Sequence, residues 1–100
     1  MKIIEKIMEK QLRPTEAAPV TFAFLGDSVT QGCFELYKTG KCSFETEFRV
    51  NEGYPAKLRQ LLELCYPRVP INMIHAGISG DTVVSGLKRA QRDVIAYHPD

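Results

Sequence analysis

The stretch Val20-Thr-Phe-Ala-Phe-Leu-Gly-Asp-Ser-Val-Thr-Gln-Gly32 decides the fold. Its first six residues are mostly apolar and rich in β-formers, which is typical of a strand that is buried on both faces. A second stretch of this kind, Ile71-Asn-Met-Ile-His-Ala76, leads into Gly77-Ile-Ser-Gly-Asp-Thr82. The sequence therefore predicts two buried strands, each followed directly by a glycine-bearing turn.

Three amphipathic segments alternate with these strands and predict helices over the first dozen residues, over 54–65 and from Asp81 or Thr82 onward. Helix, strand, helix, strand, helix is the order of a doubly wound α/β sheet with parallel strands. We therefore predict the α/β class. The residues expected to face inward are Ile3, Ile4, Ile7, Met8 and Leu12 in the first helix, Tyr54, Leu58, Leu61, Leu62 and Cys65 in the second, and Val83, Leu87, Ala90, Val94 and Tyr97 in the third.

The segment 33–51 has mixed signals, with Thr39-Gly40 marking a turn, and predicts either an irregular excursion or a small hairpin. It carries four aromatic residues. They could form a wall for an apolar acyl group, but we expect them to pack the segment onto the body of the domain. These aromatic residues are Phe34, Tyr37, Phe44 and Phe48.

Composition excludes several classes of protein. A chain of 100 residues with 44% hydrophobic and 25% charged residues is typical of one globular domain. The net charge of +1 gives no strong positive field that would attract nucleic acid or an anionic membrane, so we expect neither partner.

The start lacks the features of a secretory signal, which predicts a cytoplasmic protein. Three cysteines fit reduced thiols, with a Cys33–Cys42 bridge left open, and their spacing offers no metal site.

Ser28 has the position of a nucleophile. It follows the first strand through Gly26 and Asp27, so its hydroxyl should emerge at the carboxyl edge of the sheet. A serine nucleophile needs a base, and the oxyanion formed on attack needs backbone N–H donors. Gly77 occupies the matching position after the second strand and can present such a donor. Each residue alone has a structural interpretation, a helix cap for Ser28 and a tight turn for Gly77. Their joint occurrence at adjacent strand ends favours the catalytic interpretation.

Two motifs carry a family resemblance. Gly26-Asp-Ser-Val-Thr30 resembles the first block of the GDSL/SGNH hydrolases, and Ala76-Gly-Ile-Ser-Gly-Asp-Thr82 is similar to their second block. The resemblance spans Val20 to Asp100. It implies a flavodoxin-like fold of which residues 1–100 are the amino-terminal part of a single domain, with 1–19 as a leading helix and connector.

The same resemblance implies the site residues and the reaction. Ser28 would be the nucleophile, the N–H groups of Ser28 and Gly77 would be oxyanion donors, and Asp27 would organise the serine turn. The expected reaction is hydrolysis of small acyl esters, acetylated carbohydrates among them, through an acyl-enzyme without a metal or organic cofactor. The expected partner is a small-molecule ester substrate.

The family's asparagine donor, in a GxND segment, and its catalytic histidine, in a DxxH segment, do not occur in this sequence. Asn51 precedes a helix and Asn72 lies inside a strand. His75 should point into a packed layer, and His98 follows the third helix at the end of the sheet opposite Ser28. We therefore expect the parent protein to be an esterase and these 100 residues alone to be inactive.

The next strand of such a fold would pair with Val20–Leu25, so this edge is expected to be free. Either the chain belongs to a longer protein, or it completes its sheet with another copy. A non-catalytic α/β fragment or self-associating module is thus the alternative to an esterase.

Several charged residues have plain structural interpretations. Asp81 and Asp93 are expected to be a helix cap and a surface residue rather than an acid–base pair. The basic residues of the third helix, Lys88, Arg89 and Arg92, are expected to form its solvated face.

Overall fold

The computed structural model of the protein describes residues 2–100. Two strands, β1 (Val20–Gly26) and β4 (Ile71–Gly77), pair in parallel over their whole length, from Val20 opposite Ile71 to Gly26 opposite Gly77. The predicted parallel α/β arrangement is confirmed. The other elements are α1 (Lys2–Leu12), α2 (Ser28–Gln31), β2 (Cys33–Lys38), β3 (Phe44–Phe48), α3 (Tyr54–Cys65) and α4 (Val83–Asp93), with 3-10 turns at Val50–Glu52 and Ile95–Tyr97.

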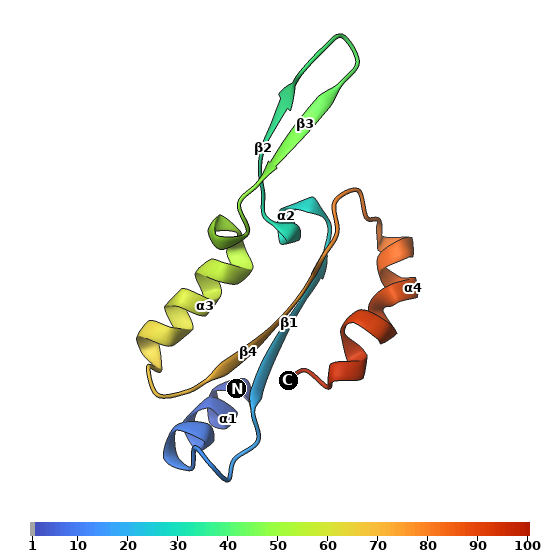
Figure 1. Cartoon of the computed structure of the whole chain (residues 1–100). Helices are drawn as coiled ribbons and strands as arrows, with labels where there is room; N and C mark the ends of the chain where they lie inside the picture. The colour runs from blue at the N-terminus through green and yellow to red at the C-terminus, as the bar shows by residue number, and fades with distance from the viewer. Residues whose placement is uncertain (1) are drawn as a thin grey trace.

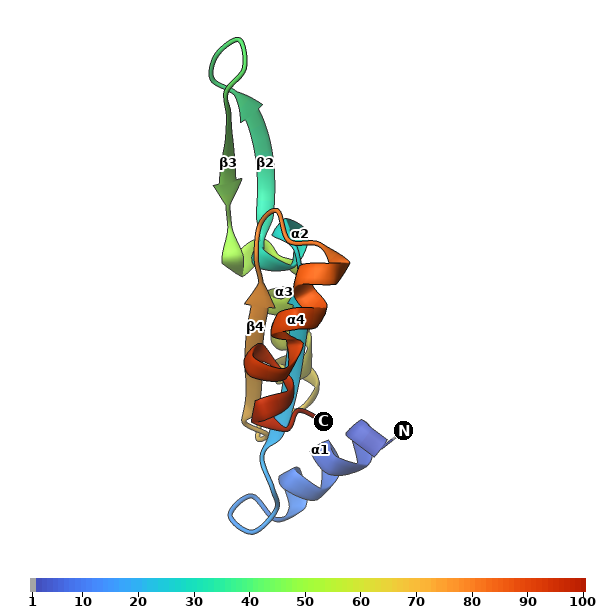
Figure 2. The ribbon, with the colours of Figure 1, turned by 90° about the vertical axis from the view of Figure 1, so that its right-hand side faces the viewer.

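Helices lie on both faces of the β1–β4 sheet, α3 on one face and α4 on the other, and α1 lies near the start of β1 (Figures 1 and 2). The buried core is at the amino-terminal ends of the strands. Ile7 of α1 packs there with Val20, Val69 and Ile71, and Leu62 of α3 joins them. The carboxyl ends of both strands therefore lie away from the core, where the chain turns toward the candidate site.

The inward stripes of the helices are only partly as predicted. In α1, Ile7 is fully buried and Ile3 and Ile4 pack against the core, but Met8 and Leu12 are exposed. The side chain of Lys10 is buried in their place. Its Nζ donates hydrogen bonds to the carbonyl oxygens of Pro14 and Ala17, at 2.7 and 2.8 Å. The ammonium group thus holds the segment between α1 and β1 against the end of α1.

The prediction for α4 is wrong at its amino-terminal end, and Tyr97, beyond its carboxyl end, is exposed as well. Val83 and Leu87 are 91% and 77% exposed, whereas Gly86 and Arg89 are buried. The helix contacts the sheet through polar bonds of Arg89 rather than through an apolar stripe, for the reason given with the site below. In α3 the half-buried Leu58 and Leu62 face inward as predicted, but Tyr54, Leu61 and Cys65 are exposed.

Strands β2 and β3 form an antiparallel hairpin, the second of the two structures expected for 33–51. The hairpin projects beyond the carboxyl ends of β1 and β4, away from the body (Figures 1 and 2). The expectation that its aromatic residues pack onto the body is therefore wrong. Phe34 and Phe44 are 53% and 62% exposed. Phe34 instead packs against the guanidinium of Arg49, whose Cζ lies 3.9 Å from the centre of the Phe34 ring. The three cysteines are free, as expected of reduced thiols.

The edge of β1 opposite β4 has no strand partner among residues 2–100, as predicted. Asp100 contacts this edge at one point. Its N–H donates to the carbonyl of Thr21 and its carboxylate accepts from the N–H of Thr21, both at 2.9 Å. Within the same residues, no helix combines the length and the apolar character that a membrane crossing needs.

Candidate active site

Ser28 is the first residue of the short helix α2, directly after the end of β1. Asp27 is the N-cap residue, and its Oδ1 accepts a hydrogen bond from the N–H of Val29 at 3.0 Å. The helix-cap interpretation of Ser28 is therefore wrong, because Asp27 does this work. Ser28 is half-buried, and its hydroxyl has no hydrogen-bond partner within residues 2–100. The hydroxyl is thus free to react with a bound molecule.

The tight turn into α2 depends on Gly26. A Cβ at this position would lie 2.9 Å from Cβ of Thr30 and nearer still to its hydroxyl. Thr30 is buried, and its Oγ1 lies 2.9 Å from the hydroxyl of Tyr54 on α3. Sequence reasoning missed this role of Thr30, although the residue belongs to the quoted motif. The buried threonine anchors the helix that carries Ser28.

The second turn lies beside the first, as predicted from the parallel strands. A Cβ on Gly77 would lie 2.7 Å from the carbonyl carbon of Thr30 and closer to the amide nitrogen of Gln31, so α2 rests directly on this glycine. Gln31 Oε1 accepts the N–H of Ser79 at 2.6 Å, and Ile78 donates its N–H to the carbonyl of Gly26 at 3.0 Å. The two motifs therefore form one continuous structure.

The N–H of Gly77 is not used in the pairing of β4 with β1. In a parallel ladder, successive residues of one strand turn their N–H and C=O groups to opposite edges. The N–H of Ile78 points toward β1, where it donates to the carbonyl of Gly26. The N–H of Gly77, the residue before Ile78, therefore points away from β1. This amide remains available to an acceptor from outside the sheet.

Arg89 holds the carboxyl ends of both strands. Its NH1 donates to the carbonyl of Ala76 at 2.9 Å and its NH2 to the carbonyl of Gly26 at 3.0 Å. Nε donates to Asp81 Oδ2 at 2.7 Å, and NH1 donates to Asp93 Oδ2 at 3.2 Å. The expectation that Arg89 belongs to a solvated face is wrong. Two strand-end carbonyls and two carboxylates accept all of its N–H groups, so the guanidinium is buried with no donor left unsatisfied.

Asp81 and Asp93, expected to be a helix cap and a surface residue, both bind the guanidinium of Arg89 through their carboxylates. Thr82, not Asp81, caps α4 in a capping box with Ser85. The pKa of Asp81 lies below its usual value because its carboxylate accepts hydrogen bonds from the Ser85 hydroxyl and then from Arg89. The pKa of Arg89 is raised, chiefly by its bond to Asp81.

This shift predicts an acid-labile contribution to stability. Because the folded-state pKa of Asp81 is below its unfolded value of about 3.9, the contribution is complete above that value and is lost as the pH falls through the folded pKa. Asp81→Asn should therefore lower the free energy of unfolding at neutral pH, and its difference from wild type should shrink below pH about 4. Urea unfolding across pH measures this. Glu16→Gln, at an exposed position on the connector, is the matched control. A difference that stays constant down to the lowest pH would contradict the assignment.

Neither His75 nor His98 forms a hydrogen bond with Ser28. His75 is exposed, not packed as predicted, because β4 is an edge strand among residues 2–100. It lines a cavity of about 440 Å³ together with Phe24 and α3 residues such as Arg59. His98 follows the Ile95–Tyr97 turn near the start of β1, as predicted. Neither imidazole hydrogen-bonds Ser28, so residues 2–100 present no base in contact with the hydroxyl.

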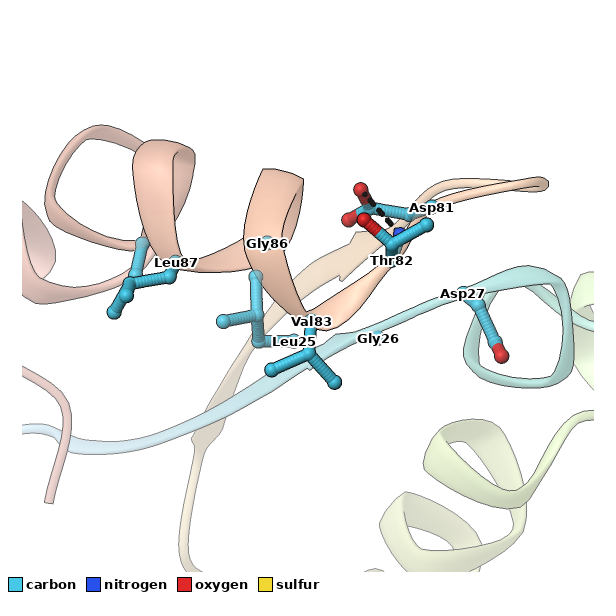
Figure 3. Close-up of a pocket in the computed structure, with 9 residues that line it drawn as sticks. Leu25, Gly26, Asp27, Asp81, Thr82, Val83, Gly86 and Leu87 are labelled. Atoms are coloured by element: carbon cyan, nitrogen blue, oxygen red, sulfur yellow. Dashed lines mark hydrogen bonds between the residues drawn. The ribbon is translucent and has the colours of Figure 1, made fainter.

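A cleft of about 440 Å³ opens between the end of β1 and the start of α4, next to Asp27. The side chains of Leu25, Val83 and Leu87 point toward the same open side of it (Figure 3). Asp81 and Thr82 form its polar end. Among residues 2–100, no group of three or more His, Cys, Asp or Glu side chains is arranged to hold a metal ion.

Known proteins resemble this chain in both sequence and structure. Over 77 residues, 77% of the chain, it is 39% identical to an acetylxylan esterase of Geobacillus stearothermophilus. The chain is homologous to part of an esterase. A solved two-domain esterase active on acetylated mannans superposes with a TM-score of 0.67 and 26% identity over 98% of the chain. These matches confirm the predicted relationship to esterases and the predicted fold class.

The matches cover only part of each relative. The chain spans 33% of the acetylxylan esterase and 22% of the mannan-active chain. No protein-family model matches the sequence.

Proposed function

We propose that this chain supplies the nucleophile and two oxyanion-binding amides of a GDSL/SGNH-type serine esterase that removes acetyl groups from polysaccharides. The observation that carries the proposal is the placement of Ser28, with a free hydroxyl, on a helix that rests on Gly77. Relatives that act on acetylated xylan or mannan support the choice of substrate.

In the proposed reaction, Oγ of Ser28 attacks the acetyl carbonyl carbon while a base takes the hydroxyl proton. The carbonyl oxygen becomes negative and accepts hydrogen bonds from the N–H groups of Ser28 and Gly77. Collapse breaks the bond to the sugar oxygen, which leaves with a proton as a hydroxyl group. Water then cleaves acetyl-Ser28 by the same steps and releases acetate. One such oxyanion donor is worth about 10²–10³ in kcat.

Asp27 has a positioning role in this proposal. Because its carboxylate accepts the N–H of Val29, it fixes the first turn of α2 without using the N–H of Ser28. The N–H of Ser28 is among the first donors of a helix, which have no acceptor within the helix. Asp27 thus organises the serine turn and leaves the donor free.

Acetate release tests the substrate class. The natural gene product should release acetate from acetylated xylan and acetylated mannan, and kcat/KM on aryl esters should fall as the acyl chain lengthens beyond acetyl. Enzymatic determination of acetate measures the first, and de-esterified xylan serves as the blank. Hydrolysis of long-chain aryl esters without acetate release from either polysaccharide would contradict the proposed substrate.

We further propose that the 100 residues by themselves lack esterase activity, since neither His75 nor His98 hydrogen-bonds Ser28. An unassisted serine stays protonated near neutral pH and is a weak nucleophile. The purified chain should hydrolyse a short-chain aryl ester at the background rate, with no further fall in Ser28→Ala or His75→Ala. Robust activity that both substitutions abolish would make His75 the base and contradict the proposal.

The exposed apolar residues beside the free edge of β1 favour self-association of the 100-residue chain as a second candidate property. Leu25, Val83 and Leu87 line one cleft there. Light scattering should give a mass above the 11.3 kDa of one chain. Leu87→Asp should shift the mass toward the monomer, whereas Leu12→Asp, on the distant and exposed end of α1, should not. A monomer at high concentration would contradict this proposal.

A further inference from the structure

One buried side chain on α4 determines how both strands end at the candidate site. Arg89 lies on a helix whose apolar side chains Val83 and Leu87 are exposed, so apolar contact does not hold this end of α4 in place. Its guanidinium bridges the carbonyl oxygens of Gly26 and Ala76 instead, at 3.0 and 2.9 Å. These carbonyls lie one step apart in the register at the ends of β1 and β4, because Gly26 pairs with Gly77 and Ala76 pairs with Leu25. Arg89 is therefore a polar clamp on the edge of the sheet that carries Ser28.

The clamp acts on the peptide unit that contains the proposed oxyanion donor. The carbonyl of Ala76 and the N–H of Gly77 belong to one planar trans peptide, so they point in opposite directions. Holding the carbonyl oxygen on NH1 of Arg89 therefore sets the direction of the Gly77 N–H. The second carbonyl, of Gly26, precedes Ser28 by two residues and also accepts the N–H of Ile78. One guanidinium thus fixes the backbone that leads into each of the two proposed donors, Ser28 and Gly77.

All five N–H groups of Arg89 are used in this arrangement. Besides the two carbonyls, Nε and NH2 bind Asp81, and NH1 binds Asp93. The planar guanidinium presents these donors in a fixed fork, which the three donors of a lysine ammonium cannot reproduce. Asp81 belongs to the turn after Gly77, so its bond to Arg89 also ties that turn to α4.

We propose that Arg89 is a positioning residue of the oxyanion hole, acting through the Ala76–Gly77 peptide without touching the substrate. The inference rests on the proposed function, because it requires Gly77 to be an oxyanion donor. Arg89 lies outside both sequence motifs, yet it orients the N–H of Gly77, which belongs to the second motif.

Arg89→Lys in the natural gene product tests this. It keeps the charge but loses the fork, so kcat for a short-chain aryl ester should fall on the order of tenfold to a hundredfold, less than the loss of a whole donor. KM should change much less, because the Gly77 amide that Arg89 positions binds the oxyanion of the transition state and not the neutral substrate. The kcat is expressed per site labelled by an excess of a fluorophosphonate, so that unfolded protein does not count. Arg92→Lys, on the same helix but 77% exposed in its side chain, is the control and should keep wild-type kcat.

Failure of this inference differs from failure of the proposed function. If Ser28→Ala is inactive but Arg89→Lys keeps wild-type kcat per labelled site, only the role of Arg89 is overturned. If Ser28→Ala keeps full activity, the proposed function falls first. Should Arg89→Lys fail to fold, Asp81→Asn replaces it, since this change removes the anchor and leaves the guanidinium. It should lower kcat per labelled site by a smaller factor, and an unchanged kcat would overturn the inference.

Discussion

Ser28→Ala in the natural gene product should lower kcat/KM for acetyl esters by a factor on the order of 10³ or more, because it removes the atom that forms the acyl-enzyme. Stability should change by no more than about 0.5 kcal/mol, since the hydroxyl has no partner within residues 2–100 and Asp27 caps the helix. Hydrolysis of a short-chain aryl ester and urea unfolding measure the two effects. Activity is expected to vanish without a change in fold.

Ser43→Ala is the matched control for this experiment. Ser43 lies in the loop of the projecting hairpin and is exposed, and its hydroxyl bonds only Thr39 within that loop. Its loss should leave both activity and stability near wild type. Wild-type turnover in Ser28→Ala would remove this serine from the mechanism.

Gly77→Ala should damage both activity and stability. The added methyl group would lie 2.7 Å from the carbonyl carbon of Thr30 and closer to the amide nitrogen of Gln31, so the backbone of α2 has to move. Such overpacking typically costs about 1–3 kcal/mol of unfolding free energy. Displacing α2 from the Gly77 amide separates the two proposed donors, which predicts a loss in kcat of about 10²–10³. Urea unfolding and steady-state kinetics on the same samples check both values.

Gly40→Ala is the control for the glycine substitution. A Cβ at Gly40 would meet only the hydroxyl of Ser43, at 2.7 Å, and that side chain can rotate away. Its activity should equal that of wild type. Wild-type kcat and stability in Gly77→Ala would contradict the close contact between α2 and β4 on which the site is built.

The strands and the pairing of the two turns were predictable from the sequence. A short apolar run before a glycine has few structural solutions, and parallel strands bring their carboxyl ends to the same edge. From this alone, Ser28 and Gly77 were expected side by side, and α2 indeed rests on Gly77. Periodicity also found the helices, because their length and flanking prolines restrict the alternatives.

The orientation of α4 was not predictable from periodicity. Helical patterning assumes that the apolar stripe faces the sheet, yet Val83 and Leu87 are exposed while Arg89 is buried. The decisive partners of Arg89 are the carbonyls of Gly26 and Ala76, 63 and 13 residues away along the chain, so no local pattern shows them. The exposure of His75 has a similar origin, because it depends on which strands flank β4.

Mapping a fluorophosphonate adduct on the natural gene product identifies the nucleophile, since this reagent reacts with activated serine nucleophiles. We expect one adduct per chain on the peptide that contains Ser28, loss of esterase activity in proportion to labelling, and no adduct in Ser28→Ala. An adduct on a different residue, with activity lost while Ser28 remains unmodified, would contradict the assignment of Ser28 as the nucleophile.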